Sequence, residues 1–150
     1  MANFKRILVP TDFTETSERA IDMALSLGER LGSSITLMHA YEIPIMGFPD
    51  GALVATADIA SRIADASRAA LNSAVAKRQG AKVKVDGILC DGVAWEEINR
   101  VADEIDADLV VIGTHGRRGL ARALLGSVAE NVVRTATRPV LTIHGPRDGK

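Results

Sequence analysis

The residues with the clearest chemical potential form a glycine-rich segment late in the chain. It holds Gly113 and Gly116 and, nine residues further on, Gly126-Ser127. Glycine lets a ligand approach the backbone closely, and the free N–H groups at a helix start form an anion site. Ser127 and Glu130 have the S-x-x-E spacing of a capping box, so helix capping alone could explain them. Capping does not explain four glycines within fourteen residues, and phosphate is the anion that the segment suggests.

The segment does not match the two common phosphate-binding fingerprints. The sequence has no G-x-x-x-x-G-K-[ST] run, so it lacks a P-loop and its lysine. No G-x-G-x-x-G follows the first apolar run, which argues against a dinucleotide site. The residues by themselves therefore favour phosphate binding no more than a structural role.

Three arginines, Arg117, Arg118 and Arg122, lie beside the predicted phosphate site. Arginine matches phosphate geometry well, and we assign Arg117 to the site. For Arg118 and Arg122 we slightly favour a solvated loop over a phosphate contact. His115 lies inside the glycine segment, where it could contact phosphate or lie at the surface.

The other reactive residue types are scattered. Three histidines and the single cysteine, Cys90, do not cluster as zinc ligands do. Asp12, His115 and Ser127 have the types of a hydrolytic triad, but the G-x-S-x-G motif is absent. We interpret Cys90 as a small buried hydrophobe rather than a redox thiol. His39, at the end of an apolar run, is interpreted as a packed or capped side chain.

The elements that must position these residues alternate along the chain. The first helix is expected to begin after Thr14 and to end at Gly32. β-Favouring apolar runs predict strands, and apolar residues at helical spacing predict helices. The predicted strands are residues 7–9, 35–38, 83–85, 109–112 and 140–143, and the predicted helical faces are residues 20–31, 59–75, 98–105 and 128–136.

This alternation predicts an α/β fold, a single Rossmann-like domain with a five-stranded parallel sheet and helices on both faces. The run 109–112 is apolar without alternation, which indicates a strand covered on both sides. Ligands of such sheets bind beyond the carboxyl ends of the strands, where the strand order reverses. We therefore expect the chemistry in segments 10–12, 39–41, 89–92 and 113–116.

Length and composition exclude several classes of protein. A chain of 150 residues with 47% hydrophobic residues predicts one globular domain, residues 1–150, with ends frayed at 1–4 and 145–150. A net charge of −1 and an aromatic content of 3% argue against nucleic acid and anionic membranes as partners.

The chain carries no sign of an export signal or a membrane span, and its one cysteine excludes an internal disulfide framework. We therefore expect a cytoplasmic protein. Residues 42–54, rich in proline and glycine, predict a long loop. This loop is either a variable surface connection or a flap over a ligand or partner.

Taken together, these motifs resemble those of the nucleotide-binding universal stress proteins. Gly113-x-x-Gly116, nine residues and Gly126-Ser127 match the G-2x-G-9x-G-[ST] signature of that family. Residues 7–12, ending at Asp12, resemble its first strand and acidic residue. Residues 37–40 are similar to its second strand, and residues 128–143 to its last helix and strand.

The resemblance implies a five-stranded fold related to the adenine nucleotide α-hydrolases, with ATP, with or without Mg²⁺, across the first, second and fourth strands. Asp12 and the backbone before it would hold adenine and ribose, Asp12 could also reach Mg²⁺ through the phosphates, and the glycines and Ser127 would hold phosphates. Ala40 stands where the family often has a larger aliphatic residue, so its adenine packing would be looser. The implied nucleotide-binding residues are Pro10, Thr11, Asp12, Ala40, Ile112, Gly113, Gly116, Gly126, Ser127 and Val128.

Three functions follow as hypotheses. The first is an ATP-binding protein with a regulatory role in the stress response and slow or no hydrolysis, because no strong catalytic base is evident. The second is an ATPase or another nucleotide-hydrolysing enzyme on the same fold. The third is a dimeric interaction module indifferent to nucleotide. The glycine signature favours the first two.

The last predicted strand is expected to join two copies of the chain. Val140, Leu141 and Ile143 make it apolar, and an exposed apolar edge strand tends to pair with another. We therefore predict a twofold symmetric homodimer, an assembly that the family resemblance also implies.

Overall fold

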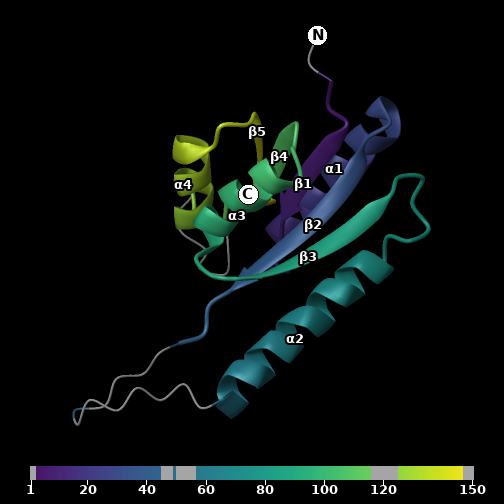
Figure 1. The fold of residues 1–150 in the computed structure, drawn as a ribbon. Coiled ribbons are helices and arrows are strands. Elements are labelled where there is room, and N and C mark those ends of the chain that lie inside the picture. The colour runs from purple at the N-terminus through teal and green to yellow at the C-terminus, as the bar shows by residue number, and fades with distance from the viewer. Residues whose placement is uncertain (1–2, 45–48, 50–56, 116–124, 147–150) are drawn as a thin grey trace.

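The computed structural model describes residues 3–44, 49, 57–115 and 125–146. Five strands alternate with four helices along this part of the chain (Figure 1). The strands are β1 (Arg6–Pro10), β2 (Ser34–Tyr41), β3 (Val85–Asp91), β4 (Leu109–Gly113) and β5 (Val140–Ile143), and the helices are α1 (Glu15–Leu31), α2 (Ala57–Ala76), α3 (Ala94–Glu104) and α4 (Ser127–Thr135).

The strands form one parallel sheet in the order β3-β2-β1-β4-β5. The chain moves outward in one direction from β1 to β3 and in the other from β4 to β5. The order therefore reverses between β1 and β4, which is where ligands of such sheets bind. The predicted α/β class and parallel five-stranded sheet are confirmed.

Each face of the sheet has its own core. Helices α1 and α2 pack on one face, where Ile7, Ile35 and Val111 are buried. Helices α3 and α4 pack on the other, over Leu8, Met38 and Val110. Figure 1 shows α3 and α4 together beside the β4–β5 end of the sheet. Alternate residues of β4 enter the two cores, which confirms the prediction that this apolar run is covered on both sides.

Helix α1 begins and ends where the sequence predicts. Thr14 is its N-cap and its side chain accepts a hydrogen bond from the Ser17 N–H. Gly32 ends it with φ of 67°, a left-handed conformation that suits glycine. The start of α1 therefore lies at a fixed position just after β1, and this is the segment that carries Asp12.

The prediction for the third strand was wrong in its position. It placed the strand at residues 83–85, whereas β3 begins at Val85 and runs to Asp91. The strand follows β2 in register from Ile35–Val85 to Tyr41–Asp91. Gly87 obscured this in the sequence, since glycine has low strand propensity. Here glycine fits because a Cβ atom would lie 2.9 Å from a methyl group of Val75 on α2.

The expected frayed ends are described only in part. Phe4, within residues 1–4, packs against the core under α1, and its carbonyl accepts a hydrogen bond from the Ser33 hydroxyl. Residues 147–150 and most of the predicted loop 42–54 lie outside the described residues. Among the helices that the structure describes, none is long and apolar enough to cross a membrane.

Candidate functional site

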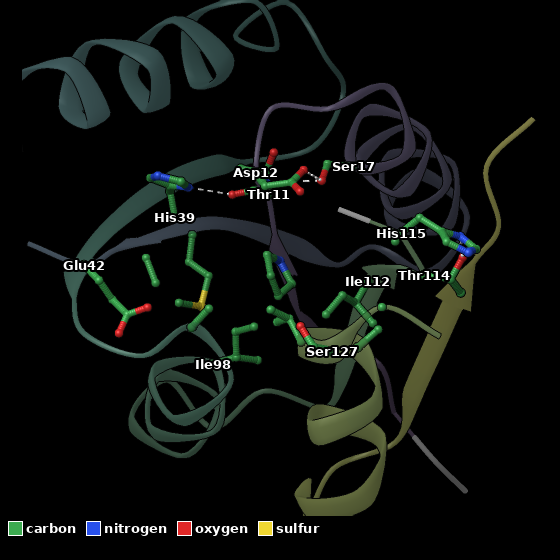
Figure 2. A pocket seen from close by; sticks show the side chains of 18 residues that line it. Thr11, Asp12, Ser17, His39, Glu42, Ile98, Ile112, Thr114, His115 and Ser127 are labelled. Carbon is green, nitrogen blue, oxygen red and sulfur yellow. Dashed lines mark hydrogen bonds between the residues drawn. The ribbon is translucent and has the colours of Figure 1, made fainter. Parts of the chain in front are cut away.

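A pocket of about 710 Å³ lies at the point where the strand order reverses. It opens beyond the carboxyl ends of β1, β2 and β4 and is closed below by α3 and the start of α4 (Figure 2). This volume is in the range of small-molecule sites. Nine of the residues assigned from the sequence line it together, namely Pro10, Thr11, Asp12, Ala40, Ile112, Gly113, Gly126, Ser127 and Val128.

The remaining assigned residues, Gly116 and Arg117, lie outside the described residues, as do Arg118 and Arg122. Other lining residues escaped the sequence analysis. Met38, Ala94 and Ile98 are apolar and resemble ordinary core positions, so no local signal distinguishes them. Ser17 could have been found, because it follows Asp12 by five residues, one helical turn beyond the cap.

At the end of β2, the backbone that faces the pocket has no partner in the part of the chain that the structure describes. The Thr11 N–H donates to the Met38 carbonyl at 2.8 Å, and β1 pairs with β2 no further than Met38. Alternate residues of a parallel strand direct their N–H and C=O groups to the same side. Those of Ala40 therefore point in the same direction as those of Met38, past the end of β1. On the opposite side, the Tyr41 carbonyl accepts the Gly92 N–H at 2.9 Å.

The backbone of Thr11 has its partners inside the protein. Its N–H group bonds to Met38, and its carbonyl accepts a hydrogen bond from Nδ1 of His39 at 2.8 Å. The His39 ring also packs on Phe13, with ring centroids 4.5 Å apart. His39 is thus a packed and hydrogen-bonded side chain, as predicted. In this arrangement Thr11 shapes the pocket without an unpaired backbone N–H for a ligand.

Asp12 lies at the top of the pocket, where β1 turns into α1 (Figure 2). Its Oδ1 atom accepts hydrogen bonds from the Thr14 N–H at 3.1 Å, from the Thr14 hydroxyl at 2.5 Å and from the Ser17 hydroxyl at 2.5 Å. The Oδ2 atom accepts none from the described residues. One oxygen of the carboxylate therefore fixes the start of α1, and the other is available to a ligand.

The start of α4 lies at the lower side of the pocket. Gly126 is its N-cap, and the Glu130 N–H makes the first helical bond, to the Gly126 carbonyl at 2.9 Å. The N–H groups of Ser127, Val128 and Ala129 precede that bond, so the helix itself provides no acceptor for them. The Gly126 N–H donates to the Thr114 carbonyl at 2.5 Å. The backbone donors left at the start of the helix belong to Ser127, Val128 and Ala129, which all line the pocket.

The capping box expected of Ser127 and Glu130 is not formed. Ser127 is the first helical residue rather than the cap, and no described side chain caps the start of α4. The Glu130 carboxylate instead pairs with Arg134, one turn later, at 2.6 Å. The Ser127 hydroxyl has no hydrogen bond to any residue that the structure describes. Helix capping therefore does not explain this serine, and its hydroxyl remains available at the pocket.

Gly113 and Gly126 are glycines for different reasons. A Cβ atom at Gly113 would lie 2.8 Å from Cγ2 of Thr16 and 3.2 Å from its backbone, so close packing of β4 against α1 requires glycine there. Gly126 has φ of −59° and ψ of 157°, which any residue can adopt. Its backbone conformation does not require glycine, and close approach of a ligand is a reason that remains.

Thr114 joins the ends of β4, β5 and α4. Its N–H donates to the Ile143 carbonyl at 2.9 Å, and its carbonyl accepts the Gly126 N–H. Its hydroxyl lies 2.9 Å from Nδ1 of His115 and 3.4 Å from Nδ1 of His144. Figure 2 shows His115 beside Thr114 at the β5 end of the pocket. The Nε2 atom of His115 is buried without a partner among the described residues.

Cys90 lies in the core between β3 and α3, away from these groups. It is 4% exposed, and its Sγ atom lies 3.7 Å from Nη2 of Arg100. Burial, with the nearby charge of Glu97, raises the pKa of the thiol above its ordinary value, although Arg100 acts against this. The geometry agrees with the expectation of a small buried hydrophobe.

We therefore expect Cys90 to react slowly with thiol reagents in the native protein, because the thiolate is the reactive form and both burial and the raised pKa disfavour it. Timed reaction with Ellman's reagent at neutral pH measures this, and the same protein in denaturant provides the full-reactivity control. Native reaction as fast as the denatured control would contradict the structure.

The sequence matches known proteins over almost its whole length. The sequence model of the universal stress protein family matches residues 3–144. Universal stress protein MJ0531 of Methanocaldococcus jannaschii is 30% identical over 146 residues, which cover 96% of this chain and 84% of that protein. Universal stress protein Rv1636 of Mycobacterium tuberculosis is 32% identical, with 96% and 99% covered.

A solved structure of a universal stress protein in complex with cAMP has the same fold. It is 26% identical to this chain, with a TM-score of 0.71, and the alignment covers 95% of this chain and 98% of that one.

Proposed function

We propose that this chain, which belongs to the universal stress protein family, binds an adenine nucleotide, ATP in particular, in the pocket between β1 and β4. The observation that carries the proposal is that one pocket has a side suited to the base and another side suited to the phosphates. At one end is the backbone of Ala40, and at the other is the start of α4 with the Ser127 hydroxyl, and neither group has a partner among the described residues.

The Ala40 end suits adenine. A backbone C=O and N–H side by side can accept from the N6 amino group of adenine and donate to its N1 atom. Guanine has the opposite pattern at these positions, with an acceptor at O6 and a donor at N1. The surrounding apolar side chains of Met38, Ile98 and Ala94 provide a surface for the ring. The side chain of Ala40 is small, so we expect it to pack loosely against the ring.

The charges of the pocket orient the nucleotide. The helix dipole and unpaired N–H groups at the start of α4 favour the phosphates. The Asp12 carboxylate repels phosphate and accepts hydrogen bonds, so the sugar hydroxyls suit the opposite side. The cAMP complex of a relative that is 26% identical supports an adenine nucleotide as the class of ligand.

Mg²⁺ would enter with the phosphates rather than bind to the protein first. Among the described side chains, no three metal-ligating groups come together. Asp12 and Glu42 are the carboxylates that line the pocket among the described residues. Because Asp12 is placed at the sugar end, the ion would be held mainly by the phosphates and by water, and Mg²⁺ commonly keeps several waters when it binds with substrate phosphates.

We further propose that the protein retains ATP in a regulatory stress role and hydrolyses it slowly or not at all. The phosphate end offers N–H groups and a serine hydroxyl, while Asp12 is engaged at the sugar end. Identification of the nucleotide released on denaturing freshly purified protein tests this. Stoichiometric ATP supports retention, whereas ADP or AMP with multiple turnovers that Asp12→Ala abolishes would favour an enzyme.

We propose that β5 joins two copies of the chain into a homodimer. The sheet has two outer strands, β3 and β5. β3 carries Asp86 and Asp91, charges that discourage pairing with another strand. β5 carries no charge, and its residues are all half-buried in the single chain.

Thr142→Pro is expected to shift the protein from dimer to monomer. Thr114 and Val110 donate to the Ile143 and Pro139 carbonyls, so the backbone groups of Val140 and Thr142 point away from β4. Proline at 142 removes one outward donor without breaking the β4–β5 ladder. Light scattering at micromolar concentration measures the mass, and Thr142→Val keeps the N–H as the control. A wild-type monomer, or a proline variant that stays dimeric, would contradict this interface.

A further inference from the structure

We propose that Ser17 is a positioning residue for nucleotide binding, which holds the Asp12 carboxylate so that its Oδ2 atom accepts a hydrogen bond from a ribose hydroxyl. This inference rests on the proposed function, which already places the sugar at Asp12, and adds the residue that holds this carboxylate in position. It makes the site selective for ribonucleotides over deoxyribonucleotides.

The hydrogen bonds around Asp12 have only one consistent direction. An ionised carboxylate can only accept, so the hydroxyls of Ser17 and Thr14 both donate to Oδ1, each at 2.5 Å. Each hydroxyl oxygen then accepts from the backbone. Ser17 Oγ takes the Asp12 N–H at 3.2 Å, and Thr14 Oγ1 takes the Ser17 N–H at 3.4 Å. The three side chains thus form a closed network at the start of α1.

This network distinguishes the two carboxylate oxygens. Oδ1 already accepts three hydrogen bonds, and Oδ2 accepts none from the described residues. Without the two hydroxyls, the carboxylate could rotate about its terminal torsion, which is broad and roughly twofold. With them, the ligand meets a single oriented acceptor whose negative charge excludes phosphate. A sugar hydroxyl is the neutral donor that a nucleotide offers there.

Ser17 acts through Asp12 rather than on the ligand. It is 6% exposed, and its hydroxyl donates its one proton to Asp12 Oδ1 and accepts the Asp12 N–H. Helix capping does not account for it either, since Thr14 is the N-cap of α1. A buried serine inside the first turn, bonded to a pocket carboxylate, is explained by the orientation of that carboxylate.

A double-mutant cycle tests the inference. We would measure the affinities of ATP, 2′-deoxyATP and 3′-deoxyATP for the wild type, Ser17→Ala, Asp12→Ala and the double variant. Ser26→Ala, an exposed serine on the same helix, is the matched control. We expect the wild type to favour ATP over at least one deoxy analogue by about tenfold, the scale of one hydrogen bond to a charged group. Ser17→Ala should lose most of this preference.

The cycle separates positioning from simple structural damage. If Ser17 acts through Asp12, Ser17→Ala has no further effect on ATP affinity once Asp12 is alanine. Equal, additive losses in both backgrounds would overturn the inference while leaving nucleotide binding intact. A wild type that binds both deoxy analogues as tightly as ATP would overturn it without any variant. A wild type that binds no ATP at all would remove the proposed function as well.

Discussion

Ser127→Asp is expected to weaken ATP binding by about 100-fold or more while leaving the thermal stability unchanged or slightly raised. Ser127 is the first residue of α4, and its hydroxyl has no partner among the described residues. A carboxylate there would occupy the place assigned to phosphate. At about 4 Å and the effective dielectric of a protein surface, two like charges repel by roughly 4 kcal/mol.

The opposite sign of the two effects makes this variant informative. A negative charge at a helix N-terminus stabilises the helix by about 0.3–1 kcal/mol. The same substitution is therefore expected to raise the stability of the fold and to lower the affinity for ATP. Thermal unfolding and calorimetric titration with ATP measure the two quantities. Ser127→Asn, which is neutral and of the same shape, is the control and should retain most of the affinity. Undiminished ATP binding by Ser127→Asp would place the phosphates elsewhere.

Gly113→Ala is expected to destabilise the fold by about 1–3 kcal/mol, the usual cost of overpacking. The added Cβ would lie 2.8 Å from Cγ2 of Thr16 and 3.2 Å from the Thr16 backbone. Backbone atoms cannot move aside as a flexible side chain does, so the start of α1 must shift. Asp12 and Ser17 lie at that start, and ATP affinity should therefore fall together with stability.

Gly80→Ala is the matched control for this prediction, because a Cβ there meets nothing within 4 Å. It should be neutral or stabilise the protein by about 0.4–1 kcal/mol, because alanine lowers the conformational entropy of the unfolded chain. Urea unfolding of both variants gives the comparison. Thr16→Ser removes the nearest methyl group and should restore part of the loss in Gly113→Ala. Equal stability of the two alanine variants would show that β4 and α1 are not packed as described.

The sequence was most informative where one local signal determines one feature. Thr14 and Gly32 mark the ends of α1 because capping depends on nearby backbone groups. The apolar run at residues 109–112 predicts a strand between two cores because each residue is buried on one face or the other. The nine assigned residues that line one pocket were assigned through the family resemblance, for which the glycine spacing is the most specific motif.

Features that depend on contacts between distant segments were less accessible. The position of β3 is determined by its register with β2 and by the approach of Val75 to Gly87. The role of Gly113 depends on Thr16, nearly one hundred residues earlier in the chain. The capping box at Ser127 failed for a local reason, since α4 begins one residue earlier than the motif requires and Glu130 pairs with Arg134 instead.

Titration of nucleotide-free wild-type protein with ATP and GTP tests the central claim most directly. The account predicts saturable binding of one ATP per chain, with GTP binding weaker by about tenfold or more. In guanine, the O6 acceptor would face the Ala40 carbonyl and the N1 donor would face the Ala40 N–H, so neither hydrogen bond could form. Absence of saturable binding at roughly millimolar ATP, far weaker than a retained ligand requires, would contradict the proposed function. Equal affinity for the two nucleotides would contradict the placement of the base at Ala40.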